Sequence, residues 1–328
     1  MDIIVQKYGG TSVEDKEKLE KICDRVISYK NKGINLVVVV SAMGKTTDKL
    51  ILKAKEFSSS PTKRELDLLL TTGEIQTVAL LSMMLNEKGY KTLGLTGQQA
   101  GIISDSTYGN ATIKSVYTEN ILNHINNDCI VIVAGFQAVD RFGNITTLGR
   151  GGSDLSAVAL ASALNAKKCE IYSDIDGVFS ADPKIIPRAK LLKKISYNEM
   201  LEAASAGAKV LHNRSVHMGK KNNMPIFVKN ALTNSRGTIV NENPKEDFEN
   251  YKVKFITKKD NISKISIIGD MVMTNKDTVH KIFDLASKEQ ITIYMITFSE
   301  LSLNLIVDKE VAEEFMKKLH YELIEKDN

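Results

Sequence analysis

The sequence predicts an α/β domain with a parallel sheet, followed by a smaller α+β domain of ferredoxin-like type. Unbroken apolar runs at 36–40 and 129–134 are typical of strands buried on both faces of a parallel sheet. Glycine-rich turns between such runs lead into helical patterns, as at 147–154. Beyond residue 250 the order of expected elements changes to ββαββα, which fits a small ferredoxin-like sandwich.

The length of 328 residues predicts about two domains, and 43% hydrophobic content is enough for full cores. Lys and Arg total 44 against 40 Asp and Glu, and the resulting charge of +4 is spread without a basic block. Nucleic acid is therefore not expected as a partner. The N-terminus lacks a signal-peptide pattern, and no apolar run approaches the ~20 residues that span a bilayer. We expect a cytoplasmic protein with no membrane partner.

Neither the cysteines nor the histidines form a pattern typical of a metal site. Cys23, Cys129 and Cys169 are far apart and have apolar neighbours, which indicates reduced core thiols rather than disulfides. The histidines contain no HExxH-like pair. His212, the only histidine inside a motif, is expected to have a structural role.

The first strand, Ile3–Gln6, leads into a predicted phosphate site. Lys7 lies at the carboxyl end of this strand, where open α/β sheets bind their ligands. Gly9 and Gly10 follow, with Thr11 and Ser12 at an expected helix start, and such a turn presents backbone N–H groups to an anion. We expect phosphate contact here, and the alternative is a solvated lysine.

The next strand ends in a polar loop, 41–47, whose Gly-Lys-Thr resembles part of a P-loop. Val39 stands where the first glycine of that motif belongs, so a P-loop is excluded. Ser41 and Thr47 remain as hydroxyl groups for a substrate. Further on, Glu74 interrupts an apolar helical segment, and it is either a surface residue or a ligand for an ammonium group.

The segment Thr147–Asp154, Thr-Leu-Gly-Arg-Gly-Gly-Ser-Asp, is the most informative stretch of the chain. Its glycines allow the backbone to approach a ligand closely, and Ser153 and Asp154 begin an apolar helical run that ends at Leu164. We therefore expect an anion site at this turn. Arg150 offers a planar fork for a carboxylate or a phosphate, while Asp154 can hold a lysine ammonium or a metal-bound water. The alternative is a tight turn whose polar residues only cap the helix.

A further loop-like segment, 173–184, combines acidic, hydroxyl and aromatic residues. This mixture suits a nucleotide, with Phe179 against the base and Lys184 toward the phosphates, and the alternative is a plain surface loop. The segment Glu199–Leu211 is expected to be helical, and the small neighbours of Lys209 within it leave room for a ligand.

A polar, turn-rich segment at 241–250 is expected to link two domains, 1–243 and 251–328. In the second domain the sequence predicts strands at 251–257, 262–268, 291–296 and 301–307 and helices at 277–287 and 311–319. No catalytic constellation is found there.

With these motifs in order, the chain resembles the aspartokinases of the amino-acid-kinase family. The resemblance is carried by Lys7–Ser12, Ser41–Gly44, Thr72–Glu74, Thr147–Asp154, Ser173–Lys184 and Gly207–His212. It implies a three-layer αβα sandwich kinase domain followed by an ACT-type domain. It also implies that MgATP phosphorylates the side-chain carboxylate of L-aspartate to give 4-phospho-L-aspartate, the first step toward lysine, threonine and methionine.

The resemblance also implies roles for individual residues. Lys7 is similar to the family's phosphate-bridging lysine, and Asp154 to the residue that orients it. Arg150 is similar to the clamp on the substrate α-carboxylate, and Glu74 to the partner of its ammonium group. The other expected substrate contacts are Ser41, Thr47, Phe136 and Ser153, and the expected nucleotide contacts are Gly9, Gly10, Ser173, Asp174, Phe179, Lys184 and the second catalytic lysine, Lys209. No protein ligand for a metal is expected, because Mg²⁺ would be held mainly through the nucleotide phosphates.

The C-terminal part departs from the family pattern. Roughly 80 residues suffice for one ACT module, where most relatives carry two. Asp277 stands where the family usually has a turn glycine that admits an effector, so that inhibition by lysine or threonine is expected to be weak or absent. An unprotected sheet edge, with strands as apolar as 265–268 and 303–307, predicts a homodimer through this domain.

Two other functions fit parts of the pattern. A kinase for another small acid, such as glutamate or acetylglutamate, would use the same sheet, but Glu74 and Arg150 together favour a substrate with both an α-ammonium and an α-carboxylate. A non-catalytic amino-acid sensor would not need Lys7, Asp154 and Lys209. Since a carboxylate nucleophile is ionised at neutral pH, no general base is expected, and catalysis reduces to positioning and charge stabilisation.

Overall fold

The computed structural model describes residues 2–208, 210–233, 235–242, 253, 256–269, 276–299 and 301–326. The chain divides into two compact units. The first comprises residues 1–204 and 208–257, and the second comprises 205–207 and 258–328. Each unit is built around hydrophobic cores of its own, as in separate domains.

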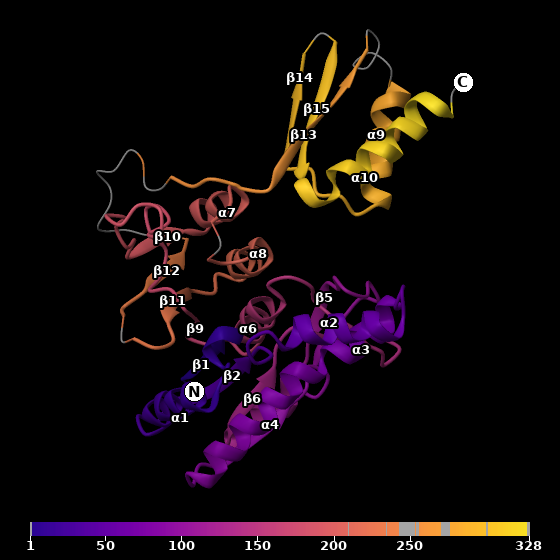
Figure 1. The fold of residues 1–328 in the computed structure, drawn as a ribbon. Helices are drawn as coiled ribbons and strands as arrows, with labels where there is room; N and C mark the ends of the chain where they lie inside the picture. Colours follow the sequence, from indigo (N-terminus) through magenta and orange to yellow (C-terminus); the bar gives the residue numbers. More distant parts are fainter. Residues whose placement is uncertain are drawn as a thin grey trace. The chain divides into compact units, whose positions relative to one another are not determined.

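An eight-stranded sheet forms the centre of the first unit (Figure 1). In order across the sheet, its strands are β10 (Lys194–Ser196), β12 (Thr238–Asn241), β11 (Ile226–Asn230), β9 (Lys168–Ser173), β1 (Ile3–Tyr8), β2 (Asn35–Val40), β6 (Ile130–Ala134) and β3 (Thr92–Leu95). All neighbours are parallel except β11 and β12. The carboxyl ends of the central strands therefore share one edge, where open α/β sheets bind their ligands.

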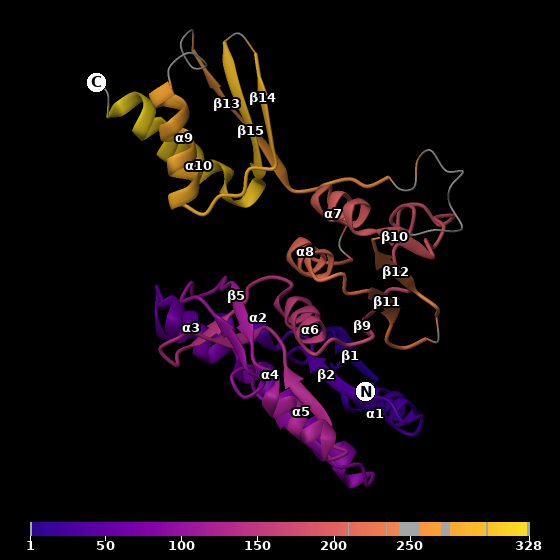
Figure 2. The same ribbon diagram turned by 180° about the vertical axis from the view of Figure 1, so that it is seen from behind.

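Helices cover both faces of this sheet, as Figure 1 and the reverse view in Figure 2 show. On one face lie α1 (Lys16–Lys30) and α4 (Thr72–Glu87), and on the other lie α5 (Glu119–Asn126), α6 (Gly152–Ala163), α7 (Tyr197–Ser205) and α8 (Asn213–Lys221). Leu19, Ile22 and Val26 recur at helical spacing and form the buried side of α1. Along β2, Val37 belongs to one core and Val38 to the other, as the pleat of a strand requires. The predicted αβα sandwich is confirmed.

A smaller sheet and two helices complete the first unit. The sheet contains β5 (Ile113–Val116), β4 (Ile102–Ser104), β7 (Gln137–Val139) and β8 (Ile145–Thr147), and the helices are α2 (Thr46–Phe57) and α3 (Lys63–Leu70). Because α3 and α4 join at Thr71 without a break, Lys63–Glu87 is longer than the apolar runs expected from the sequence. By length and composition this segment could cross a membrane, but half of its most apolar stretch is buried in the protein. Core helices meet the same criterion.

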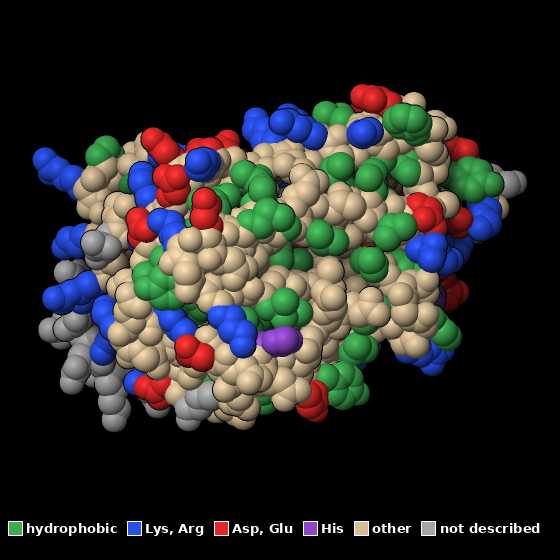
Figure 3. All heavy atoms as spheres, turned by 90° about the horizontal axis from the view of Figure 1, so that it is seen from below, with side chains coloured by type: hydrophobic (Ala, Val, Ile, Leu, Met, Phe, Trp, Pro, Cys, Tyr) green, Lys and Arg blue, Asp and Glu red, His purple; other side chains and the backbone are tan. Residues whose placement is uncertain are grey.

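The surface carries charges of both signs. On the face that Figure 3 draws, Lys and Arg side chains are interspersed with Asp and Glu, and apolar side chains lie in small groups between them. Inside the protein, the three cysteines are free and buried, as the sequence predicts.

The second unit has one three-stranded antiparallel sheet packed against two helices. Its elements are β13 (Ile262–Ile268), α9 (Lys276–Lys288), β14 (Met295–Phe298), β15 (Ser302–Asp308), α10 (Lys309–His320) and a terminal π-helical turn, η2 (Tyr321–Glu325). The strand order is β13-β15-β14, and Ile265 pairs with Leu305 across the sheet. The predicted α+β architecture is confirmed.

Three sequence expectations for the part of the chain beyond residue 250 need correction or lie outside the described residues. The strand predicted at 291–296 begins only at Met295, because the turn that ends α9 uses Gln290 in a left-handed conformation and the Ile291 N–H bonds to Ala286 O. The segment 303–307 is not an edge, since β15 lies between the other two strands. Of the strand predicted at 251–257, residues 253, 256 and 257 are not in a strand, and the others lie outside the described residues.

Candidate active site

Lys7 and Asp154 form an ion pair at the carboxyl end of β1. The Lys7 Nζ atom lies 2.6 Å from Asp154 Oδ1, and only 11% and 14% of the two side chains are exposed. Asp154 reaches this position because it lies in the first turn of α6, which packs over β1. Since a buried charge is costly without a partner, the pair holds the ammonium group at one place on the ligand-binding edge of the sheet.

A glycine turn lies beside this ammonium group and packs on the turn that follows β2. A Cβ atom on Gly9 would lie 3.4 Å from Lys7 Nζ, so that the backbone there is in contact with the lysine. A Cβ atom on Gly10 would lie 2.9 Å from Ala42 O, and the Gly44 N–H donates to Gly10 O at 3.0 Å. The turns that follow β1 and β2 therefore pack backbone to backbone, which excludes a side chain at position 10.

The helix expected at Thr11 starts later in the chain. Residues Gly10–Ser12 form a short 3₁₀ turn, η1, and α1 begins only at Lys16. The reason is local, because the Asp15 carboxylate accepts a hydrogen bond from the Lys18 N–H at 2.9 Å and caps the helix there. The glycine turn therefore relies on backbone groups of a 3₁₀ turn rather than on the first turn of α1.

Glu74 is buried beside the loop that follows β2. It lies in the first turn of α4, is 3% exposed, and accepts a hydrogen bond from the Ala42 N–H at 3.1 Å through Oε1. Its Oε2 atom has no hydrogen-bond partner among the described residues, and burial raises the pKa of the carboxyl group to about 7. Gly73 allows this close packing, since a Cβ atom there would lie 2.8 Å from Ala42 Cβ. The surface-residue alternative for Glu74 is therefore wrong, and its free oxygen suits a cationic ligand.

The hydroxyl residues expected to contact the substrate lie around the same edge. Ser41 follows β2 directly, and Thr47 lies in the first turn of α2; both are half-buried. Ser153 is almost buried beside Gly135, at which a Cβ atom would lie 2.9 Å from the serine Oγ. Phe136 has a φ of 68°, a strained conformation for an aromatic residue and one that clusters at functional sites.

Arg150 lies in a turn between two glycines that both have left-handed backbones. The φ angles of Gly149 and Gly151 are 73° and 69°, and the Gly152 N–H donates to Gly149 O at 2.9 Å. Helix α6 begins at Gly152 without a side-chain cap, so the alternative that the polar residues only cap this helix is wrong. Arg150 is exposed and has no hydrogen bond or ion pair within the described part of the chain. Its guanidinium donors are therefore available to a ligand.

The segment expected to bind a nucleotide begins next to the ion pair. Ser173 ends β9, the strand beside β1, and the Gly9 N–H donates to Tyr172 O at 3.2 Å. Asp174 and Lys184 are exposed, and Phe179 is half-buried. Thr238 anchors this segment, because its hydroxyl oxygen accepts a hydrogen bond from the Val178 N–H at 2.8 Å.

Lys209, the second lysine expected in catalysis, lies outside the described residues. The helix predicted at 199–211 ends at Ser205, because the Ala208 N–H bonds to Ala203 O and closes the last turn. His212 follows and has the expected structural role: its Nδ1 accepts from the Arg214 N–H at the start of α8, and its side chain packs against Gly151.

Two charged residues near this site were missed by sequence reasoning. Asp67 is 1% exposed and Arg214 is half-buried, and both bond to the segment that precedes Arg150. A signal existed for Asp67, since it lies three residues before Leu70 on the apolar side of a helix. No such signal existed for Arg214, because its hydrogen-bond partners are more than 60 residues away in the sequence.

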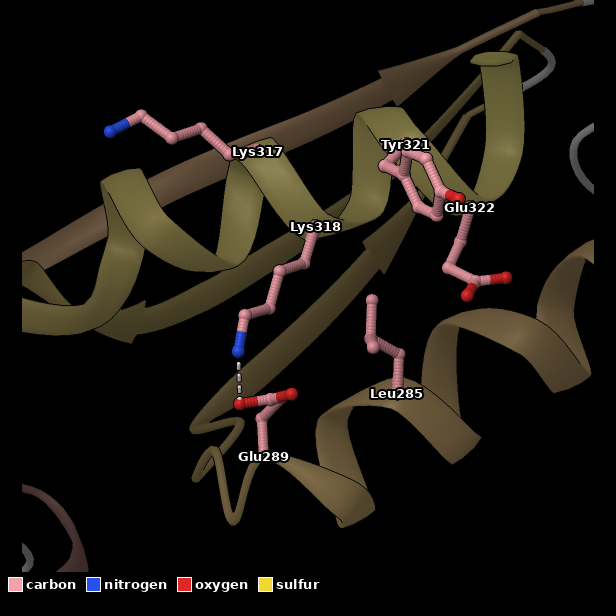
Figure 4. Close-up of a pocket in the computed structure, with 6 residues that line it drawn as sticks. All are labelled: Leu285, Glu289, Lys317, Lys318, Tyr321 and Glu322. Atoms are coloured by element: carbon pink, nitrogen blue, oxygen red, sulfur yellow. Dashed lines mark hydrogen bonds and ion pairs between the residues drawn. The ribbon is translucent and has the colours of Figure 1, made fainter. Parts of the chain in front are cut away.

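The second unit contains a hollow of about 310 Å³ that is unrelated to these residues. It lies between α9 and α10 and is lined by Leu285, Glu289, Lys317, Lys318, Tyr321 and Glu322 (Figure 4). Its charged groups are already paired, among them Lys318 with Glu289 and Glu322 with Lys326. We therefore assign it no substrate.

The fold and the site define a phosphotransferase class. The sequence model of the amino acid kinase family matches residues 2–230, and a model of an ACT domain matches residues 265–323. The chain belongs to the amino acid kinase family, and within that family of ATP-dependent kinases it is one of the aspartokinases, as its relatives show.

Two relatives and one solved structure illustrate the likeness. The aspartokinase of Geobacillus stearothermophilus is 50% identical over 82% of this chain, which spans 66% of that relative. Aspartokinase 2 of Bacillus subtilis is 43% identical over 99% of this chain and 82% of its own length. The crystal structure of the aspartate kinase from Synechocystis is 29% identical, with a TM-score of 0.68, and the likeness covers 97% of this chain and 68% of that one.

Proposed function

We propose that this chain transfers the γ-phosphoryl group of MgATP to the side-chain carboxylate of L-aspartate and forms 4-phospho-L-aspartate. The observation that carries this proposal is the buried Lys7–Asp154 pair at the carboxyl end of β1. The loop after β2 packs on Glu74, whose Oε2 has no hydrogen-bond partner in the described part of the chain, and Arg150 lies just before the helix that carries Asp154. An amino acid with two carboxylates offers one group to each of these three charges. The proposed place in metabolism is the entry to lysine, threonine and methionine synthesis, in the cytoplasm.

On the substrate side, Glu74 binds the α-ammonium group and Arg150 binds the α-carboxylate through its two parallel donors. Ser41, Thr47 and Ser153 add hydroxyl contacts around the substrate, and Phe136 lines its site. The side-chain carboxylate then faces Lys7. Since this carboxylate is ionised at neutral pH, the site needs no general base, and its residues act by positioning the nucleophile and stabilising charge.

On the nucleotide side, the residues present fit a phosphate chain. The glycine turn leaves space that a Cβ atom would fill, with Lys7 Nζ beside it. Ser173, Asp174, Phe179 and Lys184 are the proposed nucleotide contacts, with Lys209 as a second phosphate-binding lysine. No group of three or more metal-ligating side chains occurs among the described residues. In this proposal Mg²⁺ binds mainly through the phosphates. The bound ion supplies charge neutralisation on the phosphates.

A kinase for another acid is the second candidate. An N-acetylated acid lacks the ammonium group and would leave the Glu74 oxygen without a partner, and an unpaired buried carboxylate is costly. L-Glutamate can pair with both Glu74 and Arg150, but its side-chain carboxylate is one methylene further from them and would not meet Lys7 in the same position. A coupled assay of ADP formation with L-aspartate, L-glutamate and acetylglutamate tests this. We expect turnover with L-aspartate alone, and preference for either other acid would contradict the proposal.

A further inference from the structure

A buried carboxylate holds the end of β8, three residues before Arg150. Asp67 of α3 accepts three hydrogen bonds: from the Thr147 hydroxyl at 2.7 Å, from the Thr147 N–H at 2.8 Å and from the Gly109 N–H at 2.9 Å. Asp67 thereby fixes both the end of β8 and the turn at 109–111. Those two segments are also joined directly, since the Ala111 N–H donates to Thr147 O at 2.9 Å.

A guanidinium group holds the same two segments through their other side. Arg214 of α8 donates to Leu148 O and Ala111 O, and at 2.9 Å to the side-chain oxygen of Asn110. Leu148 itself is fully buried. Asp67 and Arg214, two opposite charges 147 residues apart in the chain, therefore fix the residues just before the Arg150 turn.

The backbone of the Arg150 turn is further restricted by the two glycines on either side of Arg150. Gly149 has a left-handed backbone, and a Cβ atom there would lie 2.8 Å from the Asn110 side-chain oxygen that Arg214 binds. Gly151 has the same handedness and packs on His212, two residues before Arg214. The direction in which Arg150 leaves the backbone is therefore determined by where Thr147 and Leu148 are held.

We infer that Asp67 and Arg214 are positioning residues that fix the Arg150 turn and so set the affinity for the substrate α-carboxylate. This inference rests on the proposed function, in which Arg150 binds that carboxylate. Neither residue contacts the substrate. A bidentate contact requires both donors to meet both oxygens, and a displacement of about 1 Å in such a site costs up to about a hundredfold.

Arg214→Met tests the inference, because it keeps much of the side-chain volume and removes all three hydrogen bonds. We expect KM for L-aspartate to rise about tenfold to a hundredfold, while KM for ATP stays within about twofold. Arg214→Lys, which retains one donor group, should show a smaller change in the same direction and covers the case in which the methionine variant does not fold.

Arg25→Met is the matched control. Arg25 is also half-buried and also bonds to two backbone carbonyls, Ala231 O and Thr233 O, but these lie away from the Arg150 turn. We expect the control to lower the melting temperature without raising KM for L-aspartate. An equal rise in KM for L-aspartate in Arg25→Met and Arg214→Met would mean that Arg214 has only a general structural role. A rise in KM for ATP in Arg214→Met would mean the same.

Arg150→Met, measured alongside, separates this inference from the proposed function. If it raises KM for ATP rather than for L-aspartate, the assignment of Arg150 fails and the proposed function with it. If it raises KM for L-aspartate while both Arg214 variants leave it unchanged, only the positioning inference is overturned. Asp67→Leu provides the second arm, because it keeps the branched shape of the side chain and removes the acceptors of all three hydrogen bonds, and it should show the same selective rise.

Discussion

Asp154 Oδ1 and Lys7 Nζ lie 2.6 Å apart, although the two residues are 147 positions apart in the sequence. The helix that carries the aspartate packs over the strand that carries the lysine, and both side chains are largely buried. Each neutralises the other in the free protein. The lysine Nζ is thus held in one place before a phosphate arrives, and a preorganised donor of this kind is what stabilisation of a developing charge requires.

Lys7→Ala is expected to lower kcat by about 10² to 10³, the usual cost of one such donor, and to change folding much less. Lys209→Ala is expected to behave in the same way. Steady-state rates with saturating ATP and L-aspartate, together with melting curves, check this. Turnover of Lys7→Ala at the wild-type rate would remove Lys7 from the mechanism.

Arg150→Lys is expected to raise KM for L-aspartate strongly and KM for ATP little. A lysine keeps the charge but cannot form two parallel hydrogen bonds, so that roughly 1.5 to 3 kcal/mol of charge-assisted bonding is at stake. The two Michaelis constants, each measured at saturating co-substrate, test the assignment. A shift confined to ATP would place Arg150 at the phosphates instead.

Glu74 is expected to make aspartate binding depend on pH. Burial raises its pKa to about 7, so the free site carries a neutral carboxyl below that pH, and an ammonium ligand must displace its proton. KM for L-aspartate should therefore rise as pH falls from 8 to 6. Glu74→Gln should have a high KM that varies little over this range, and an unchanged KM in that variant would refute the assignment.

The same pKa makes a prediction about stability. A carboxyl group whose pKa is raised from 4.5 to about 7 binds its proton more tightly in the folded state. The stabilisation that this proton gives the folded state is therefore lost as pH rises from 4.5 to about 7. Above pH 7 the folded state carries the full cost, roughly 3 kcal/mol, of burying the ionised carboxylate. Glu74→Gln should gain melting temperature relative to the wild type between pH 5 and pH 8, and a difference that does not change with pH would contradict this.

The sequence was sufficient for features that depend on local patterns. The apolar run at 36–40 identified a buried parallel strand, and the glycines around Arg150 identified a tight turn that leads into a helix. It was not sufficient for contacts between distant segments. Arg214 binds carbonyl groups of Leu148 and Ala111, and backbone carbonyls have no sequence signature, so that only the fold reveals this anchor. A local feature misplaced the start of α1. The glycine turn predicted a helix start at Thr11, but the Asp15 side chain caps the helix, which begins at Lys16.

The second unit leads to a prediction about assembly. Among the described residues, strands β13 and β14 form the two edges of the sheet. Apolar side chains on these strands are more than half exposed, with exposed fractions of 75% for Ile268, 57% for Met295 and 55% for Phe298. An open edge beside apolar side chains favours pairing with another strand. We therefore expect a homodimer joined through residues from about 251 onward.

Light scattering tests this on the full chain and on a chain shortened to end near Asn243. We expect a dimer and a monomer, respectively, and a full-length monomer at micromolar concentration would contradict the prediction. Ile268→Lys should weaken the dimer, whereas Met316→Lys, which changes an exposed residue of α10, should not. Inhibition by lysine or threonine is expected to be weak, because the family resemblance places Asp277 where members usually have the turn glycine of the effector site. Strong inhibition by millimolar lysine that disappears in the shortened chain would show instead that this unit binds an effector despite Asp277.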